Sequence, residues 1–414
     1  MVELRWARPE DLPAVARISS RCFPGCDEAG RLERIRSDPR FDVDDILVAE
    51  EAGRIVGGAT LLPLEVWSGG VGLPAGGVAS VQIDPDFRRR GIAQVVMKRI
   101  LEAHRERSFC LSMLYPYDPA FYRRLGYATL VRWIELRLRT RSLPSPDAAA
   151  LVRTATEADL EALVDCHRRS LPSHNGGLTR TLEFWKARVL APMRRIALFQ
   201  PNGQVEGYFL YELHETTDHL QQVLSIREWV AASAAAQAAL LGYLNAQRAQ
   251  CPETRLFAPV DCPWPLLLAE PRSPVYANPE CGFYSTGTTG TGPMGRVQDL
   301  RGLFATERRF SGPPLTCHFR LVETSPLPAD ESVDPAAGQA TVEFNGSTAA
   351  LTANTPSAWV ECDPGTMAQI YFAAVRPSDA VRWGAARVDS PKTATALDRL
   401  FAQVAPFVHP SDYF

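Results

Sequence analysis

The chain has 414 residues, of which 46% are hydrophobic and 22% are charged, and its formal net charge is −3. This length is enough for two to four domains, each with its own core. The slight negative charge argues against nucleic acid as the main partner, because binding to a phosphate backbone needs a broad basic surface. No 18-residue apolar run is present, so the sequence predicts no membrane span.

The first residues and the cysteines bear on the compartment. The chain opens with several charged residues, so we expect no signal peptide and a cytoplasmic location. Nine cysteines, an odd number, are scattered without a Cys-x-x-Cys pair, which is typical of reduced thiols. Cys22 and Cys26 are the closest two, and no histidine lies near them in sequence. The sequence therefore predicts no metal site.

An internal repeat occupies the first two thirds of the chain. The residues Arg5, Ala7, Asp11, Leu12 and Ala14 recur 148 positions later as Arg153, Ala155, Asp159, Leu160 and Ala162. Downstream, Ile46–Gly57 matches Ile196–Gly207 with an offset of 150. In each copy a charged helix start is followed by a strand, a glycine turn and a second strand. Two matches at nearly one offset predict a duplicated domain.

The stretch from Val81 to Ala93 carries the clearest chemical signal. An alternating strand ends at Pro85, and a basic turn leads to a helix expected from Ile92 to about His104. Small residues at Gly91 and Ala93 let backbone N–H groups of residues 89–93 close around an anion at the positive end of the helix.

The arginines of this turn, Arg88, Arg89 and Arg90, add full charges that suit phosphate. The alternative is a solvated arginine run before an ordinary amphipathic helix. The order of strand, proline, basic turn and helix favours a pyrophosphate site, with the attached arm of the ligand along Val81 and Ile83.

The second copy lacks this turn. Around residues 223–241 it offers the run Ile226-Arg227-Glu228-Trp229-Val230 and then an alanine-rich helix. Neither a Gly-x-Ala turn nor an arginine cluster is present there. We therefore predict that the second copy is a scaffold without an anion site.

A second chemical element follows in the first copy. A buried strand over residues 109–114 leads to a short helix that Asp118 caps, Pro119 starts and Gly126 stops. This order brings Tyr122 beside the C-terminal end of the strand, within reach of the ligand's far end. The alternative is that Tyr122 and its neighbouring tyrosines only pack in the core. Tyr127 is expected to begin the next strand and to pack there.

The last third of the chain predicts a separate α+β domain. We expect it to open with a helix from Met294 and to continue with strands at residues 315–322, 340–344 and 348–352. Helices are expected at residues 366–375, 377–383 and 392–401. No cluster of catalytic side chains is apparent in this region.

These motifs resemble those of a known family. Arg88, Gly91 and Ala93 match the R/Q-x-x-G-x-G/A acyl-CoA signature of the GNAT acetyltransferases, and residues 121–127 resemble the element whose tyrosine protonates the departing thiolate. The complete order resembles the Eis (enhanced intracellular survival) branch, with an active GNAT domain, a degenerate GNAT domain and a sterol-carrier-like domain. Met294–Leu300 and Pro410–Phe414 are weaker matches to that branch.

The resemblance implies a fold of α/β and α+β classes. It implies tandem GNAT domains, with mixed central sheets flanked by helices, followed by a sterol-carrier-protein-like α+β domain. The expected ranges are 1–140 for the catalytic domain, 148–292 for the degenerate domain and 294–414 for the last domain. Ser142–Pro146 reads as the first linker.

The resemblance also implies an acetyl-CoA-dependent N-acetyltransferase that acts on a primary amine, such as an aminoglycoside, a polyamine or a lysine-like group, without a metal. The coenzyme would be held by Val81, Ile83, Arg88, Arg89, Arg90, Gly91, Ile92 and Ala93. Tyr122 would be the general acid, and the carboxylate of the last residue, Phe414, would enter the active site as the general base. The expected substrate contacts are Phe23, Asp27, Glu28, Asp412 and Tyr413.

One departure leaves the acceptor open. Members of the branch that acetylate aminoglycosides tend to carry acidic side chains near the terminus, whereas the penultimate residue here is Tyr413. The resemblance further implies a homo-oligomer, with a hexamer as the suggested form. Two other functions are considered: a non-enzymatic lipid or sterol carrier that senses acyl-CoA, and a protein N-acetyltransferase.

Overall fold

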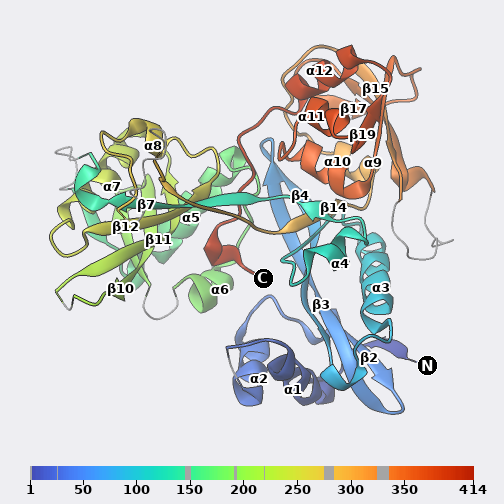
Figure 1. Cartoon of the computed structure of the whole chain (residues 1–414), viewed down its shortest axis with the longest axis horizontal. Helices are drawn as coiled ribbons and strands as arrows, with labels where there is room; N and C mark the ends of the chain where they lie inside the picture. Colours follow the sequence, from blue (N-terminus) through green and yellow to red (C-terminus); the bar gives the residue numbers. More distant parts are fainter. Residues whose placement is uncertain are drawn as a thin grey trace. The chain divides into compact units, whose positions relative to one another are not determined.

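The computed structural model describes residues 2–25, 27–144, 151–190, 194–218, 220–274, 284–323 and 335–414. Its contacts divide the chain into two units (Figure 1). The first unit contains residues 1–130, 293–403 and 414, and the second contains residues 131–292 and 404–413. The predicted linker Ser142–Pro146 lies within the described residues only as far as Pro144.

The first unit contains a seven-stranded sheet in the order β1-β2-β3-β4-β5-β14-β6. Its strands are β1 (Glu3–Trp6), β2 (Ile46–Glu51), β3 (Arg54–Ser68), β4 (Val71–Ile83), β5 (Leu111–Leu114), β6 (Ala128–Thr129) and β14 (Met294–Val297). Only the β4–β5 pair is parallel. Its helices are α1 (Leu12–Cys22), α2 (Glu28–Ser37), α3 (Ile92–Glu106) and α4 (Pro119–Arg123).

The successive apolar residues of β2 explain why helices cover both faces of this sheet. Leu47 and Ala49 pack in one buried cluster with the apolar face of α3. Ile46 and Val48 pack in another with α1. Successive strand residues point to opposite faces, so a strand that is apolar at every position is buried on both sides.

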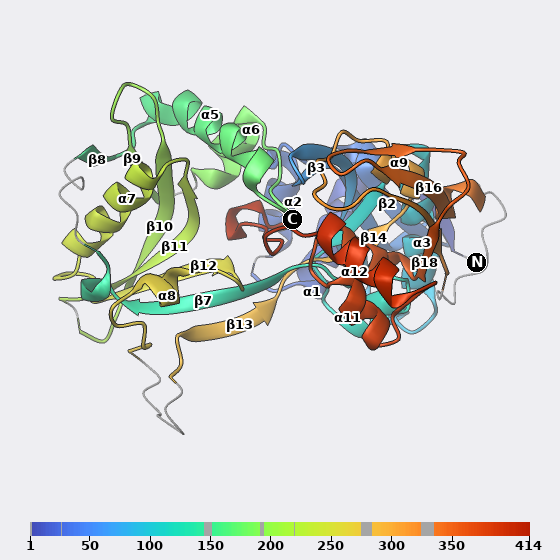
Figure 2. The same cartoon turned by 90° about the horizontal axis from the view of Figure 1, so that it is seen from above.

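The second unit repeats this plan with the order β13-β7-β12-β11-β10-β9-β8 (Figure 2). Its strands are β7 (Arg132–Arg139), β8 (Val152–Thr154), β9 (Arg195–Phe199), β10 (Gly207–Glu215), β11 (Gln222–Ala231), β12 (Glu253–Pro259) and β13 (Gly287–Thr291). Its helices are α5 (Leu160–Ser170), α6 (Leu182–Phe184), α7 (Ala234–Ala246) and α8 (Trp264–Leu267). As α1 and α3 do in the first copy, α5 and α7 pack in separate core clusters.

The structure confirms the predicted duplication in detail. The guanidinium of Arg5 donates to both oxygens of Asp11 at 2.6 and 3.1 Å, and Arg153 donates to Asp159 at 2.8 and 2.6 Å. Each carboxylate also accepts a backbone N–H of the following helix start, at 2.8 Å in both copies. The ion pair lowers the pKa of both Asp11 and Asp159.

Two strands differ from the sequence expectation. Residues 132–139, expected in the first domain, form β7 and pair with β12 and β13 in the second sheet. Met294–Val297, expected to open a helix, is instead β14 and pairs with β5 and β6 in the first sheet. Both strands lie next to a boundary, and the partner of a strand far away in sequence cannot be seen in its own pattern.

The last α+β region has a five-stranded sheet in the order β17-β16-β15-β18-β19. Its strands are β15 (Leu315–Leu321), β16 (Gln339–Phe344), β17 (Ala349–Leu351), β18 (Ala358–Cys362) and β19 (Ala386–Val388). Its helices are α9 (Leu300–Phe304), α10 (Pro364–Tyr371), α11 (Pro377–Arg382) and α12 (Pro391–Leu400). The three predicted strands and three predicted helices are present, whereas β18 and β19 were not predicted.

Aromatic rings form the interior of this last region. Six buried rings make a continuous set of edge-on and tilted contacts, with centroid separations of 4.8–6.4 Å: Phe304, Phe310, Phe319, Phe344, Tyr371 and Phe401. Such packing is favourable beyond the apolar area that it buries. In the described part of the chain, no helix is long and apolar enough to span a bilayer.

Candidate active site

The first sheet opens where β4 and β5 part. These parallel strands pair only from Ala75 to Val78, although β4 continues to Ile83. A bulge follows the paired part, and Ser80 has a φ of 51°. Among the described residues, no strand pairs with the β5-facing edge of residues 79–83. A free strand edge can pair with an extended ligand arm through its N–H and C=O groups.

The turn after β4 leaves the start of α3 uncapped. Gly91 is the N-cap residue, has a φ of 79° and provides no side chain to accept the first N–H groups of the helix. Arg89 also has a positive φ, of 62°. Because the first N–H groups of a helix have no intrahelical acceptor, they are available to an anion. Residues 88–91 are all exposed, so the cradle is open to a ligand.

A buried carboxylate holds this turn in place. Asp84 accepts from Arg21 at 2.6 Å and from Arg54 at 2.8 Å, and its side chain is 2% exposed. It also accepts the backbone N–H of Asp86 at 3.2 Å. Two cations on one buried carboxylate tie the end of β4 to α1 and β3, and so support the residues that lead into the turn.

The other predicted coenzyme residues lie along the same path. Val81 and Ile83 pack at the edge of the core cluster that contains α3, and Ile92 is buried in it. The guanidinium of Arg88 donates to the Ile83 carbonyl at 3.4 Å. Ala93 is partly buried in the first turn of α3. The structure thus brings together the predicted strand, turn and helix start.

Arg90 lies beside the same turn. Its guanidinium is 4.8 Å from the centre of the Phe87 ring, and it pairs with Glu51 at 3.3 Å. Because both partners are partly exposed, this pair contributes little to stability, and the guanidinium can turn toward a phosphate.

Tyr122 lies on α4, in the same core cluster as Val78 and Leu114, the residues at which β4 and β5 separate. Asp118 caps α4 by accepting from the backbone N–H of Ala120 at 3.0 Å. The Tyr122 hydroxyl has no hydrogen-bond partner in the described part of the chain. Burial, and then the nearby Tyr127 and Asp118, raise the pKa of Tyr122 above its ordinary value. The phenol is therefore protonated at neutral pH.

The neighbouring tyrosines have other partners. Tyr127 is buried immediately before β6, and its hydroxyl is 2.6 Å from the Ser112 hydroxyl. Tyr115 packs edge-on against the ring of Phe414, with centroids 5.1 Å apart. Phe414 also approaches β4, since a side chain added at Gly77 would lie 3.2 Å from its ring. The Phe414 ring therefore lies close to Gly77, the neighbour of Val78, where β4 and β5 separate.

The predicted substrate loop begins beside the end of β4. The thiol of Cys22, at the end of α1, donates to the Ile83 carbonyl at 3.3 Å. Phe23 follows directly and is partly buried. Asp27 caps α2 by accepting the Gly30 N–H at 2.9 Å, and Glu28 is exposed in the first turn of α2.

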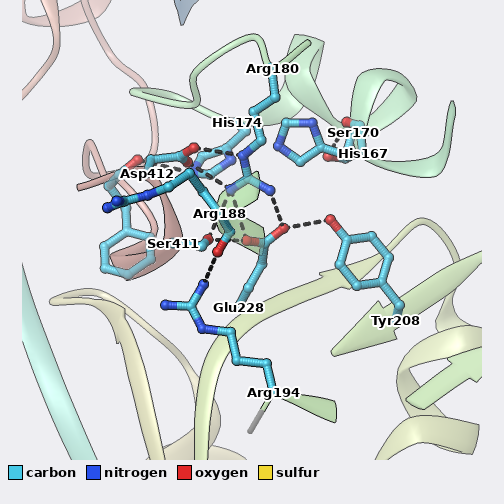
Figure 3. A network of polar contacts seen from close by, with 11 residues as sticks. His167, Ser170, His174, Arg180, Arg188, Arg194, Tyr208, Glu228, Ser411 and Asp412 are labelled. Carbon is cyan, nitrogen blue, oxygen red and sulfur yellow. Dashed lines mark hydrogen bonds and ion pairs between the residues drawn. The ribbon is translucent and has the colours of Figure 1, made fainter. Parts of the chain in front are cut away.

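The two predicted substrate residues near the chain end have different surroundings. Tyr413 is half exposed. Asp412 is 2% exposed, and both of its oxygens accept from Arg180, at 2.6 and 2.8 Å (Figure 3). The other carboxylate on Arg180 is that of Glu228, which was not predicted as a functional residue. A signal was present, because Glu228 is two residues from Val230 in a buried strand, on the face where an apolar side chain is expected.

The second copy lacks the open cradle. The N-cap residue of α7 is Ser233, whose hydroxyl accepts the Ala236 N–H at 3.1 Å and donates to Glu206 at 2.9 Å. The helix start that matches α3 is therefore already satisfied by a side chain. No arginine stands in the turn from β11 to α7.

Cysteines and metal ligands do not contribute a second site in the described ranges. The seven described cysteines carry free thiols. No group of three or more histidine, cysteine or acidic side chains is arranged to hold a metal ion in this part of the chain.

Comparisons with known protein families match the three regions in order. Residues 3–130 and 176–297 each match an acetyltransferase (GNAT) domain, and residues 327–409 match a sterol carrier protein domain. An uncharacterised N-acetyltransferase of Streptomyces avermitilis is 28% identical over 154 residues, and one of Streptomyces coelicolor is 30% identical over 144 residues. Each alignment covers 34% of this chain, and 37% and 33% of the relatives, so the chain matches about a third of their length.

Solved structures resemble the fold along the whole chain. A GCN5-related N-acetyltransferase from Anabaena variabilis has a TM-score of 0.81 at 18% identity, and covers 100% of both chains. One from Kribbella flavida has a TM-score of 0.80 at 21% identity, covering 100% of this chain and 98% of its own. Eis1 from Mycobacterium abscessus has a TM-score of 0.77 at 19% identity, with 100% of both chains covered. The chain therefore has two regions that match acetyltransferase (GNAT) domains, followed by one that matches a sterol carrier protein domain, in a fold shared with GCN5-related N-acetyltransferases.

Proposed function

We propose that the chain transfers an acetyl group from acetyl-CoA directly to a primary amine, with a mechanism like that of the Eis branch. The observation that carries this proposal is a convergence within the first unit. The unpaired edge of β4, the uncapped start of α3, Tyr122 and the terminal Phe414 all lie around the point where β4 leaves β5.

The chain's own groups suit the donor. The N–H groups of residues 89–93, with the guanidiniums of Arg88, Arg89 and Arg90, would hold the pyrophosphate. The free edge from Val81 to Ile83 would pair with the pantetheine arm. The Val81 N–H would donate to the thioester carbonyl oxygen and stabilise the negative charge that develops there.

Two groups would move protons in this reaction. The carboxylate of Phe414, directly or through water, would take a proton from the amine as the new C–N bond forms. Tyr122 would give its proton to the sulfur as the C–S bond breaks, and would recover it from solvent. A tyrosine is protonated at neutral pH, and burial raises the pKa of Tyr122 further, so the phenol is in the protonated state that a general acid needs.

The acceptor is an amine whose recognition we assign to the loop after α1. Phe23 offers an apolar surface, and the exposed carboxylates of Asp27 and Glu28 offer negative charge that attracts an ammonium group. Aminoglycosides, polyamines and lysine-like amines all satisfy this chemistry. The cytoplasmic location and the homo-oligomer stay predictions.

No observation favours the alternative of a lipid carrier. The interior of the sterol-carrier-like region is occupied by six packed aromatic rings. Rings in mutual contact of this kind are typical of a packed core, so we assign this region a structural role.

The test is a thiol-release assay with acetyl-CoA and a panel of polyamines, aminoglycosides and lysine peptides. We expect turnover with at least one amine, and loss of turnover when two residues are added after Phe414, with acetyl-CoA binding unchanged. The same two residues added at the N-terminus are the control. Absence of turnover with every amine, or full turnover of the extended chain, would contradict the proposal.

A further inference from the structure

The last residues of the chain are bound by the second copy rather than left free. Residues 404–413 belong to the second unit. Asn175 donates to the Val404 carbonyl at 2.8 Å and accepts the Phe407 N–H at 2.8 Å. The His174 ring contacts the Phe407 carbonyl at 2.9 Å. At Gly176, which has a φ of 93°, a side chain would meet the Phe407 carbonyl at 2.8 Å, so the two backbones lie in close contact.

The strongest contact of this tail is with Arg180. Its guanidinium donates to Asp412 at 2.6 and 2.8 Å and to Glu228 at 2.9 and 2.8 Å. It also donates to the Ser411 hydroxyl at 3.0 Å. The Ser411 and Tyr208 hydroxyls both donate to Glu228. Figure 3 shows Arg180 between the carboxylates of Asp412 and Glu228.

This cluster is almost completely removed from water. The side chains of Arg180, Glu228 and Asp412 are 1%, 0% and 2% exposed. Ionised groups at this depth persist only when each is paired and hydrogen-bonded. The planar guanidinium can serve two carboxylates at once, which a lysine ammonium cannot do with the same geometry. Asp412 is therefore held by a partner that the second copy supplies.

The position of Glu228 relates this cluster to the duplication. β11 pairs with β12 only from Val223 to Ile226, so the second sheet opens as the first one does. Glu228 lies two residues beyond this last paired residue, as Ser80 lies two residues beyond Val78. The short helix at Pro410–Asp412 contacts β11. In the first copy we assign the unpaired part of β4 to the coenzyme arm. In the second copy the corresponding part of the sheet contacts the chain's own tail.

We propose that Arg180, held by Glu228, is a positioning residue that fixes Asp412 and thereby sets the position of the Phe414 carboxylate. This inference rests on the proposed function, in which that carboxylate is the base. Only Tyr413 separates the anchored Asp412 from Phe414, whose ring packs on Tyr115. Asp412 then acts as an anchor and not as a contact of the amine, since an ammonium group would have to displace Arg180.

The test uses the full chain with Asp412→Asn, which keeps the size of the side chain and leaves the Arg180–Glu228 pair intact. The first readout is the rate at which carboxypeptidase A releases Phe414 from the native protein. The second is kcat and KM for the acetylation of the best amine of the panel. We expect release to rise about tenfold, and kcat to fall about tenfold with KM for acetyl-CoA unchanged. Arg180→Lys, which keeps the charge and loses the planar fork, should behave in the same way.

Asp159→Asn is the matched control, because Asp159 also pairs with an arginine, Arg153, in the second copy but lies far from the tail in sequence. It should alter neither readout. Release that is no faster in Asp412→Asn overturns the anchor, and faster release with unchanged kcat overturns the positioning role. If the chain extended after Phe414 keeps full turnover, the proposed base is wrong instead, and the release rates still decide whether Arg180 holds the tail.

Discussion

The two acetyltransferase copies share a fold and differ at one helix start. In the first copy, Gly91 leaves the N–H groups of α3 without a side-chain acceptor. In the second, Ser233 accepts the corresponding N–H of α7. An anion can bind where the backbone donors are unsatisfied, and a serine cap removes that need. A side-chain cap therefore removes a backbone donor that an anion would otherwise bind.

A second difference concerns what each sheet opening receives. In the first copy, β4 beyond Val78 has a free edge that suits the arm of a coenzyme. In the second, Glu228 stands at the matching position of β11 and is paired with Arg180 and, through it, with the tail. The second copy therefore has a buried charge cluster where the first has a free strand edge.

The largest expected effect comes from Tyr122, which we assign as the general acid. Tyr122→Phe keeps the ring packed in the core and removes the proton donor. General acid catalysis contributes about 100- to 10,000-fold, so kcat should fall by that range while KM for acetyl-CoA stays the same. Steady-state kinetics at pH 7.5 measure this, with Tyr243→Phe on α7 of the second copy as a matched variant expected to keep both kcat and KM for acetyl-CoA. Unchanged kcat in Tyr122→Phe would remove the phenol from the mechanism.

The next effect tests the open helix start itself. Gly91→Val places a β-branched residue at a φ of 79°, which only glycine adopts easily, so the cradle must distort. We expect acetyl-CoA affinity to fall about 100-fold, or about 2.7 kcal/mol, by calorimetric titration. Gly203→Val is matched, because Gly203 has a φ of 80° in a turn of the second copy and open space around it. Equal losses of affinity in both variants would contradict the assignment of the site.

Acid should weaken the second unit before the first. Burial lowers the pKa of His174 to about 4 and of His409 to about 3, and it also lowers the pKa of His167, all in the second unit. In the first unit burial lowers the pKa of His104 to about 3. A folded-state pKa below the unfolded value means that stability is present above pH 6.5 and is lost as pH falls toward 4. The loss is about 1.4 kcal/mol per pH unit for each such histidine.

Hydrogen exchange measured from pH 7 to pH 5, corrected for the intrinsic pH dependence, tests this order. Amides of α5 should lose protection before those of α3. His409→Gln should reduce the pH dependence of protection around the tail. Earlier loss of protection in α3 would show that the buried histidines do not set acid stability.

The smallest expected effect comes from removing the side-chain cap of α7 in the second copy. Ser233→Ala removes the cap of α7 and should lower the free energy of unfolding of the second unit by about 1 kcal/mol. Acetyl-CoA affinity should not change, because we assign the coenzyme site to the other copy. Thermal unfolding and titration of the same sample measure both. A change of affinity in this variant would contradict the division of roles between the copies.

Much of the fold could be predicted from the sequence because local patterns carry it. The Arg5–Asp11 and Arg153–Asp159 pairs are six residues apart, so the repeat was visible before its structure. The strand, turn and helix from Val81 to His104 follow one another without interruption. Short-range order of this kind needs no knowledge of distant partners.

The parts that could not be predicted depend on long-range pairing. β14 pairs with β5 across 180 residues or more, and its four residues have no pattern that distinguishes a strand from a helix turn. Arg180 and Asp412 are 232 residues apart. Glu228 in an apolar strand signalled a buried carboxylate, but it could not show which cation would reach it.

The number of acetyl-CoA molecules bound per chain, measured by isothermal titration calorimetry on the full chain, tests most directly which copy binds the coenzyme. We predict one site per chain, which Gly91→Val weakens and Ser233→Ala leaves intact. Two sites per chain, or a single site that is unaffected by Gly91→Val, would contradict the claim that only the first copy binds the coenzyme.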